Sequence, residues 1–316
     1  MTDAERDPGL HAFRVVRAIA DTGSITAAAA ALGYSQPAIS QYVRRIERRV
    51  GMPIVERVGR RVRLTAAGEV LARHASAVAL AIDAAAGELD QLRGLHSGRV
   101  RIVGFPSASP TIVPRVLALL ADRAPGVVVT YVEAEPPEAV AAVREDRADI
   151  ALTFSFPGDR EDPHGASARG LAVDRIGVDP MYVVVPEGHA VAAAAVADLG
   201  DLSEASWIAG CPRCRGHLLD LCERSGFTPR IAFETDNIVA VESLVARGTG
   251  VATLPGLAVS SFPLLAGIRA VPLPPRAQRT LHTVTAQGAE RVPALRAALA
   301  AVSEAAAATE RSAPRG

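Results

Sequence analysis

GSITAAAAALGYSQPAISQYVRRIERRVG, residues 23–51, holds two short helix-forming segments on either side of a glycine turn. Ser24 can cap the first segment, whose run of alanines permits close packing against another helix. Gly33 makes the turn, Ser35 can cap the second segment, and Pro37 falls in its first turn, where a missing N–H costs nothing. Two short helices joined by a tight turn predict a helix-turn-helix.

The second of these helices carries the residues expected to contact DNA. In a helix-turn-helix it enters the major groove with its N-terminal residues facing the base edges. Glutamine pairs with adenine through two hydrogen bonds, serine donates or accepts, and arginine binds phosphate. The expected DNA contacts in this helix are Ser35, Gln36, Pro37, Ser40, Gln41, Arg44 and Arg45.

A short hairpin is expected after the second helix. In residues 54–64, apolar and basic residues alternate around a glycine, which predicts a wing whose tip arginines, Arg60 and Arg61, contact phosphate or the minor groove. Residues 44–63 contain eight arginines and two glutamates, although the formal net charge of the chain is zero. The attraction to nucleic acid is therefore local, and we expect residues 1–65 to form a winged helix-turn-helix DNA-binding domain.

A long alanine-rich segment follows, and we expect a helix from Ala66 to about Leu92 with Thr65 as its cap. At about 1.5 Å per residue this helix would span roughly 40 Å, and apolar residues recur along one side of it. A helix of this length with an apolar stripe needs a partner. We therefore expect this helix to pack against a partner.

The rest of the chain alternates strand-forming and helix-forming segments, beginning with a strand at residues 100–103. That order predicts parallel sheet with flanking helices. The predicted fold class is therefore α/β multidomain, with a C-terminal domain over residues 97–306. Residues 307–316 are predicted to be a disordered tail.

The N-terminal sequence resembles the DNA-binding domain of the LysR-type transcriptional regulators. The similar stretch covers about sixty residues, from Phe13 through the segment quoted above to RVRLTAAG, which ends at Gly68. It contains the family's GS, SQPA and LT.AG patterns at matching positions. It departs from the family at Ile46 and at Ile54-Val55, where leucine and Leu-Phe are usual; both changes keep the position apolar.

The same resemblance extends to the C-terminal domain, where Asp149-Ile150-Ala151-Leu152 fits the family pattern. It implies a two-lobed, periplasmic-binding-protein-like effector domain, with lobe I at 97–175 and 266–306 and lobe II at 176–265. It also implies that residues 66–96 are a linker and dimerisation helix and that the chain forms a homodimer or homotetramer. The implied partners are a small-molecule effector and double-stranded DNA. Two-fold symmetry then predicts an inverted-repeat operator.

Effector contacts are expected where strands end and helices begin, because helix N-termini there offer unpaired N–H groups. Three hydroxyls follow the first strand of this domain, and they suit a carboxylate or another small anion. Family resemblance places effector contacts in the same loops. The predicted residues are Ser107, Ala108, Ser109, Thr153, Phe154, Cys211, Arg213 and Asn237.

Three cysteines, Cys211, Cys214 and Cys222, lie within twelve residues. A thiol at a helix N-terminus beside Arg213 would have a lowered pKa and be open to oxidation. Cys214 and Cys222 fall on one apolar face of the expected helix, which favours a place in the core. Three alternatives remain open at this stage: a structural or pocket-lining role, redox sensing through Cys211, and metal binding.

Other function classes find less support in the sequence. No glycine-rich cofactor loop, metal-ligand cluster or catalytic triad can be assembled around the seven histidines, so we expect no enzyme activity, cofactor or metal. A thiol oxidoreductase using Cys211 and Cys214 is the enzyme alternative. A polar, acidic N-terminus and the lack of an eighteen-residue apolar stretch predict a cytoplasmic protein without a membrane partner, and they oppose a secreted solute-binding protein.

Overall fold

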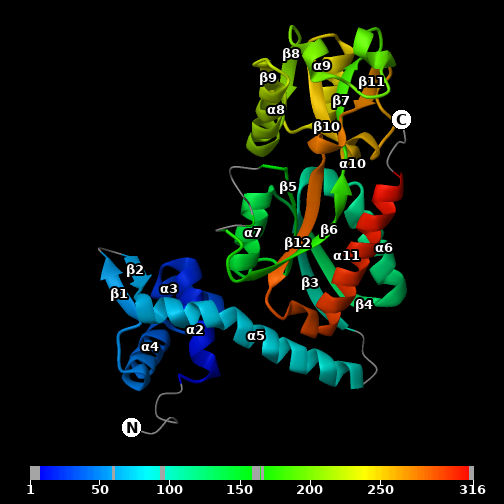
Figure 1. Ribbon diagram of the computed structural model, residues 1–316. Helices are drawn as coiled ribbons and strands as arrows, with labels where there is room; N and C mark the ends of the chain where they lie inside the picture. The colour runs from blue at the N-terminus through cyan, green and yellow to red at the C-terminus, as the bar shows by residue number, and fades with distance from the viewer. Residues whose placement is uncertain (1–7, 59–60, 93–96, 159–163, 165–166, 313–316) are drawn as a thin grey trace. The chain divides into compact units, whose positions relative to one another are not determined.

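The computed structural model describes residues 8–58, 61–92, 97–158, 164 and 167–312, and Figure 1 shows its helices and strands. The chain forms two compact units. The first comprises residues 1–94 with 286–293, and the second comprises residues 95–285 with 294–316.

The first unit begins with three helices and a hairpin, as predicted. Ser24 caps the second helix by accepting from Ala27, and Ser35 caps the third by accepting from Ala38. Gly33, which ends the second helix, has a φ of 72°, a left-handed value that favours glycine. These elements are α2 (Leu10–Thr22), α3 (Ile25–Leu32), α4 (Gln36–Val50), β1 (Val55–Val58) and β2 (Arg61–Leu64).

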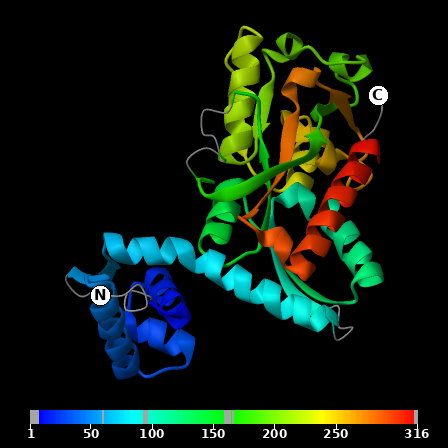
Figure 2. The same cartoon turned by 60° about the horizontal axis from the view of Figure 1, so that its bottom comes forward.

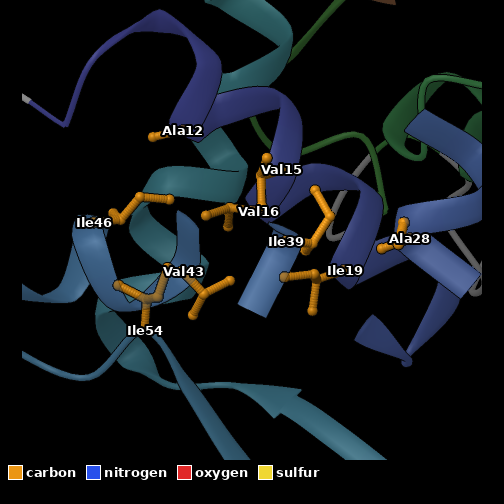
Figure 3. Close-up of a cluster of buried hydrophobic side chains, with 10 residues drawn as sticks. Ala12, Val15, Val16, Ile19, Ala28, Ile39, Val43, Ile46 and Ile54 are labelled. Carbon is orange, nitrogen blue, oxygen red and sulfur yellow. The ribbon is translucent and has the colours of Figure 1, made fainter. Parts of the chain in front are cut away.

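A small apolar core holds these helices together (Figure 3). Side chains of α2, α3 and α4 and Ile54, just ahead of β1, point into one cluster. Every labelled member is at most 3% exposed, so little apolar surface of this cluster remains in water. The labelled residues are Ala12, Val15, Val16, Ile19, Ala28, Ile39, Val43, Ile46 and Ile54.

Polar contacts fix the chain on both sides of the hairpin. The Glu47 carboxylate of α4 accepts from the backbone N–H of Ile54 at 3.0 Å. Thr65 donates its hydroxyl to the carbonyl of Pro53 at 2.7 Å and accepts from the N–H of Gly68 at 3.3 Å. Thr65 therefore caps the next helix, as predicted, and ties its start to the segment before the hairpin.

That next helix, α5 (Ala66–Leu92), has the predicted bounds. Val70, Ile82 and Leu89 are 42%, 46% and 58% exposed, so part of its apolar stripe is uncovered in the single chain. By length and composition alone, Ala66–Leu89 would be sufficient to cross a membrane. A second protein chain covers such a stripe equally well, and charged residues such as Arg73 and Asp83 interrupt the apolar sequence of this helix.

The second unit consists of two lobes. In the first lobe, a five-stranded sheet has the order β4-β3-β5-β12-β6; β3 is parallel to β4 and β5, and β12 is antiparallel to β5. Helices α6 and α11 lie on one side of this sheet and α7 on the other (Figures 1 and 2). The elements are β3 (Ser97–Gly104), α6 (Ile112–Arg123), β4 (Gly126–Glu133), α7 (Pro136–Arg144), β5 (Ile150–Ser155), β6 (Leu171–Asp179), β12 (Arg279–Ala286) and α11 (Pro293–Ser312).

The second lobe has its own five-stranded sheet, of order β11-β7-β10-β8-β9. Strand β8 is parallel to β9 and β10, whereas β7 is antiparallel to both of its neighbours. The elements are β7 (Met181–Pro186), β8 (Ser206–Ala209), α8 (Pro212–Arg224), β9 (Arg230–Glu234), α9 (Ile238–Ala246), β10 (Val251–Pro255), α10 (Gly256–Val259) and β11 (Ile268–Pro272).

Three features differ from the predictions. Strand β11 pairs with β7, so residues 268–272 belong to lobe II and not to lobe I. Strand β6 was not predicted, because its sequence shows no regular apolar–polar alternation, and all its residues except Asp179 are partly buried or exposed. Helix α11 continues to Ser312, so residues 307–312 are not a disordered tail; Thr309 is buried there and donates to the carbonyl of Ala305.

Candidate functional site

The predicted DNA-recognition residues lie together on the outside of the first two turns of α4. Gln36 and Gln41 are exposed, and Ser40 lies between them, half-buried. The amide of Gln36 donates to the hydroxyl of Ser40 at 2.9 Å, which holds both side chains on one face. The opposite face of α4 carries Ile39 and Val43 into the core, so the polar face must point away from it.

Arginines continue this surface along the helix. Arg44 and Arg45 are exposed, and the Arg45 guanidinium lies 6.0 Å from the centre of the Tyr42 ring. Strands β1 and β2 pair in antiparallel register, as the wing prediction requires. The predicted tip residue Arg60 and the side chain of Arg61 lie outside the described residues.

A second candidate site is a cavity of about 70 Å³ lined by residues of both lobes of the second unit. The carboxyl ends of six strands meet there: β3, β4 and β5 from lobe I, and β8, β9 and β10 from lobe II. This is the position expected for ligands in α/β sheets. The lining residues are Phe105, Pro106, Ser107, Glu135, Phe154, Phe156, Met181, Ile208, Gly210, Cys211, Cys214, Thr235, Asp236, Ile238, Val241, Ala252, Thr253, Leu254, Pro255 and Arg279.

A buried ion pair joins the two segments that cross between the lobes. Asp179, at the end of β6, and Arg279, at the start of β12, are 3% and 2% exposed, and their closest N–O distance is 2.7 Å. Arg279 also donates to the Ser107 hydroxyl at 2.6 Å, and Asp179 accepts from the N–H of Leu257 at 3.0 Å. Burial raises the pKa of Asp179, and the adjacent Arg279 guanidinium lowers it in part.

Three of the eight predicted effector residues, Ser107, Phe154 and Cys211, line this cavity. The other five, Ala108, Ser109, Thr153, Arg213 and Asn237, do not line it.

The three-hydroxyl cradle predicted for an anion is not formed, because each hydroxyl already has a partner. Ser109 donates to the Glu133 carboxylate at 2.6 Å, and Ser107 accepts from Arg279. Thr111 donates to the carbonyl of Ser107 at 2.6 Å.

Two other predicted polar side chains are also engaged. The Thr153 hydroxyl contacts His164 at 2.7 Å, and Asn237 caps α9 by accepting from Ala240 at 3.1 Å. Arg213 is buried behind Phe154, with its guanidinium carbon 5.8 Å from the ring centre.

The cysteines are arranged differently from the prediction. Cys211, at the N-cap of α8, is buried, and its sulfur lies 3.1 Å from that of Cys214. The hydrogen bond with Cys214 and burial raise the pKa of the Cys211 thiol, whereas the sequence predicted a lowered value. Cys214 lies half-buried at the cavity and not in the core. Cys222 is in the core as predicted, and burial raises its pKa to about 12.

Sequence reasoning missed Glu135 and Arg279 as cavity residues, whereas Asp236 lies in the helix-capping pair with Asn237 that the sequence placed at the cleft. Glu135 follows β4 and precedes α7, so the rule about the carboxyl ends of strands points to it directly. Burial raises the pKa of Glu135, and one of its carboxylate oxygens is buried without a hydrogen-bond partner among the described residues. No group of three or more His, Cys, Asp or Glu side chains in the described part of the chain is placed to hold a metal ion.

Two family models match this chain over nearly its whole length. Residues 10–69 match the bacterial regulatory helix-turn-helix protein model of the lysR family, and residues 93–307 match the LysR substrate binding domain. This chain belongs to the LysR family of transcriptional regulators. It is a DNA-binding regulator that responds to a small-molecule effector.

Curated relatives and a solved structure agree with this assignment. A probable hydrogen peroxide-inducible genes activator of Mycobacterium avium is 32% identical, with 82% of this chain and 81% of that protein covered. A protein of the same description from Streptomyces viridosporus is 31% identical, with 95% of this chain and 97% of that protein covered. The structure of a full-length OxyR variant from Pseudomonas aeruginosa has a TM-score of 0.70 at 21% identity and covers 98% of both chains, which shows the shared fold.

Proposed function

We propose that this LysR regulator recognises an inverted-repeat operator through the N-terminal turns of α4 and binds its effector in the cavity between the lobes. The observation that carries the first part is the exposed polar face of α4, where Gln36 and Ser40 are held together by a hydrogen bond. Such a helix presents donors and acceptors to base edges in the major groove. We further propose that the protein works in the cytoplasm, where the bacterial chromosome lies.

Removing the side chains at the start of α4 is expected to weaken sequence preference. Gln36→Ala and Ser40→Ala should each weaken binding to the operator by about 5- to 150-fold, the value of one good base contact, and leave binding to random DNA unchanged. Fluorescence anisotropy with the DNA upstream of its own gene, at several salt concentrations, measures both quantities.

Arg17→Ala provides the control for this experiment. Arg17 lies on α2 and pairs with Asp21 at 3.0 Å, away from the proposed recognition face. This variant should bind the operator like the parent. Equal losses on operator and random DNA in Gln36→Ala would contradict a base contact by this residue and would assign it to the phosphate backbone.

The cavity supports the second part of the proposal. It is mostly apolar, with a small number of polar groups, and six strand ends converge on it, which is the usual construction of a ligand site. By the measure that gives one water molecule about 10–15 Å³, its volume suits a molecule of about five heavy atoms.

A thiol response at Cys211 is a second candidate, favoured by the 3.1 Å distance between the Cys211 and Cys214 sulfurs. A disulfide needs a sulfur separation of about 2.05 Å, so a small approach suffices. In the net reaction, the two thiols and one hydrogen peroxide give one disulfide and two molecules of water: each sulfur gives up one electron and one proton, and the O–O bond of the peroxide breaks. The names of the mycobacterial and Streptomyces relatives agree with this candidate. The raised pKa of Cys211 opposes it, because the thiolate is the reactive form.

Under the thiol candidate, peroxide should change operator affinity about tenfold in the parent protein, a usual coupling between two sites, and leave Cys211→Ser unaffected. Anisotropy before and after peroxide treatment measures the change, and mass spectrometry locates the disulfide. Cys222→Ser is the matched control. Its thiol belongs to α8 but is buried in the hydrophobic core and does not line the cavity. Identical peroxide responses in the parent and Cys211→Ser would rule this candidate out.

A further inference from the structure

The charge that lines the cavity is negative. Three of its described lining residues are charged: Glu135, Asp236 and Arg279. The guanidinium of Arg279 already has a full counter-charge, because Nε and Nη2 both donate to Asp179, at 2.9 and 2.7 Å. Arg279 attracts the Glu135 carboxylate and lowers its pKa in part, but Arg279 and Asp179 together add no net charge, so Glu135 and Asp236 leave the lining with a net negative charge.

The two carboxylates come from different lobes. Glu135 precedes α7 in lobe I, and Asp236 lies between β9 and α9 in lobe II. Burial is the main cause of the raised pKa of Glu135, and repulsion from Asp236 raises it further, so the two groups interact across the cavity.

Glu135 also needs a donor. Its Oε2 atom is buried and has no hydrogen-bond partner among the described residues. A buried acceptor of this kind costs free energy until a donor reaches it. The thiol of Cys211 interacts with the same carboxyl group, and both residues line the cavity, so a donor bound in the cavity can reach Glu135.

We propose that the cavity binds a small organic ammonium compound, whose charged group donates to Glu135 and faces Asp236 while its carbon chain lies against the apolar wall. This inference rests on the proposed function, in which the cavity is the effector site. Phe154, Ile238 and Leu254 are among the apolar lining residues. A carboxylate ligand, which the sequence suggested, would meet two like charges and one guanidinium that is already paired.

Three probes with the same number of carbon atoms test the charge directly: butylammonium, 1-butanol and butyrate, each titrated calorimetrically into the full-length protein. We expect butylammonium to bind at least about tenfold more tightly than either of the others, the lower limit for a hydrogen bond to a charged group. Glu135→Gln keeps the volume and removes the charge, so it should abolish this preference. Glu138→Gln, an exposed neighbour in α7 that does not line the cavity, should keep it.

The Gly210→Leu variant separates this inference from the proposed function. Gly210 lines the cavity, and a Cβ there would meet Cys214 at 3.4 Å and Asp236 at 3.6 Å, which are ordinary contacts, so the larger side chain blocks the cavity. Loss of probe binding in this variant supports the cavity as the ligand site. Equal binding of the three probes, tighter butyrate binding, or no binding overturns the ammonium inference, whereas binding that survives Gly210→Leu contradicts the cavity proposal itself.

Discussion

Arg279→Met is expected to destabilise the effector domain by about 3–5 kcal/mol, because it leaves the Asp179 carboxylate buried without a counter-charge. Both side chains are almost fully buried, so water cannot compensate for the lost partner. The variant also loses the donor to Ser107 and the guanidinium that lies 4.8 and 4.5 Å from the ring centres of Phe105 and Phe154. Urea unfolding of the full-length protein, followed by circular dichroism, measures the loss.

Two controls identify the cause of this loss. Arg123→Met makes the same substitution in an exposed ion pair with Glu304, at 2.6 Å, and should cost far less stability, because water screens and solvates both charges. The double variant Arg279→Met, Asp179→Leu removes both buried charges and should recover much of the stability. Similar losses in Arg279→Met and Arg123→Met would contradict the importance of burial.

The pH dependence of Arg279→Met follows from the same carboxylate. Burial already raises the pKa of Asp179 in the parent, and loss of the guanidinium removes the largest opposing cause. A carboxyl group whose pKa is higher in the folded state favours folding when protonated. The destabilisation should therefore be largest at neutral pH and should shrink as the pH falls towards the ordinary aspartate value of about 3.9.

Local signals made the N-terminal helices predictable. Each helix end there depends on residues within a few positions of it: Ser24 and Ser35 cap from their own side chains, and Gly33 takes a left-handed φ. The structure also explains the aspartate in the family pattern at residues 149–152. Asp149 accepts from the backbone N–H of Arg101 at 2.7 Å and forms an ion pair with its guanidinium. That partner lies 48 positions away, which the sequence pattern alone does not show.

The cavity was only partly predictable because its chemistry depends on distant pairs. The rule about strand ends found Ser107, Phe154 and Cys211, yet it could not show that Ser107 is occupied by Arg279, 172 residues further along the chain. The helix N-terminus suggested a reactive Cys211, but its contacts with Cys214 and Glu135 reverse the direction of the pKa shift. Strand β11 was assigned to the wrong lobe for the same reason, since only its pairing with β7 identifies its sheet.

Gly68→Ala is expected to destabilise the DNA-binding unit by about 1–3 kcal/mol or more, the usual cost of adding an atom to a filled site. A Cβ at Gly68 would collide with the carbonyl oxygen of Ile54 and lie 3.1 Å from side-chain atoms of Leu64. Relaxation is restricted because Thr65 holds both sides of this contact, through Pro53 and through the N–H of Gly68 itself. The measurements are denaturant unfolding of the full-length protein and operator affinity by anisotropy.

Gly216→Ala gives the matched comparison for this last prediction. Gly216 lies inside α8, is exposed, and has nothing within 4 Å of an added Cβ. The same substitution should there stabilise the protein by about 0.5–1 kcal/mol, because alanine loses less backbone entropy in a helix than glycine. If alanine lowers the stability at position 68 and raises it at position 216, the close approach to Ile54 explains why glycine ends the LTAAG motif. Helix propensity alone would give the same sign at both positions. A stabilising effect of Gly68→Ala would contradict that explanation.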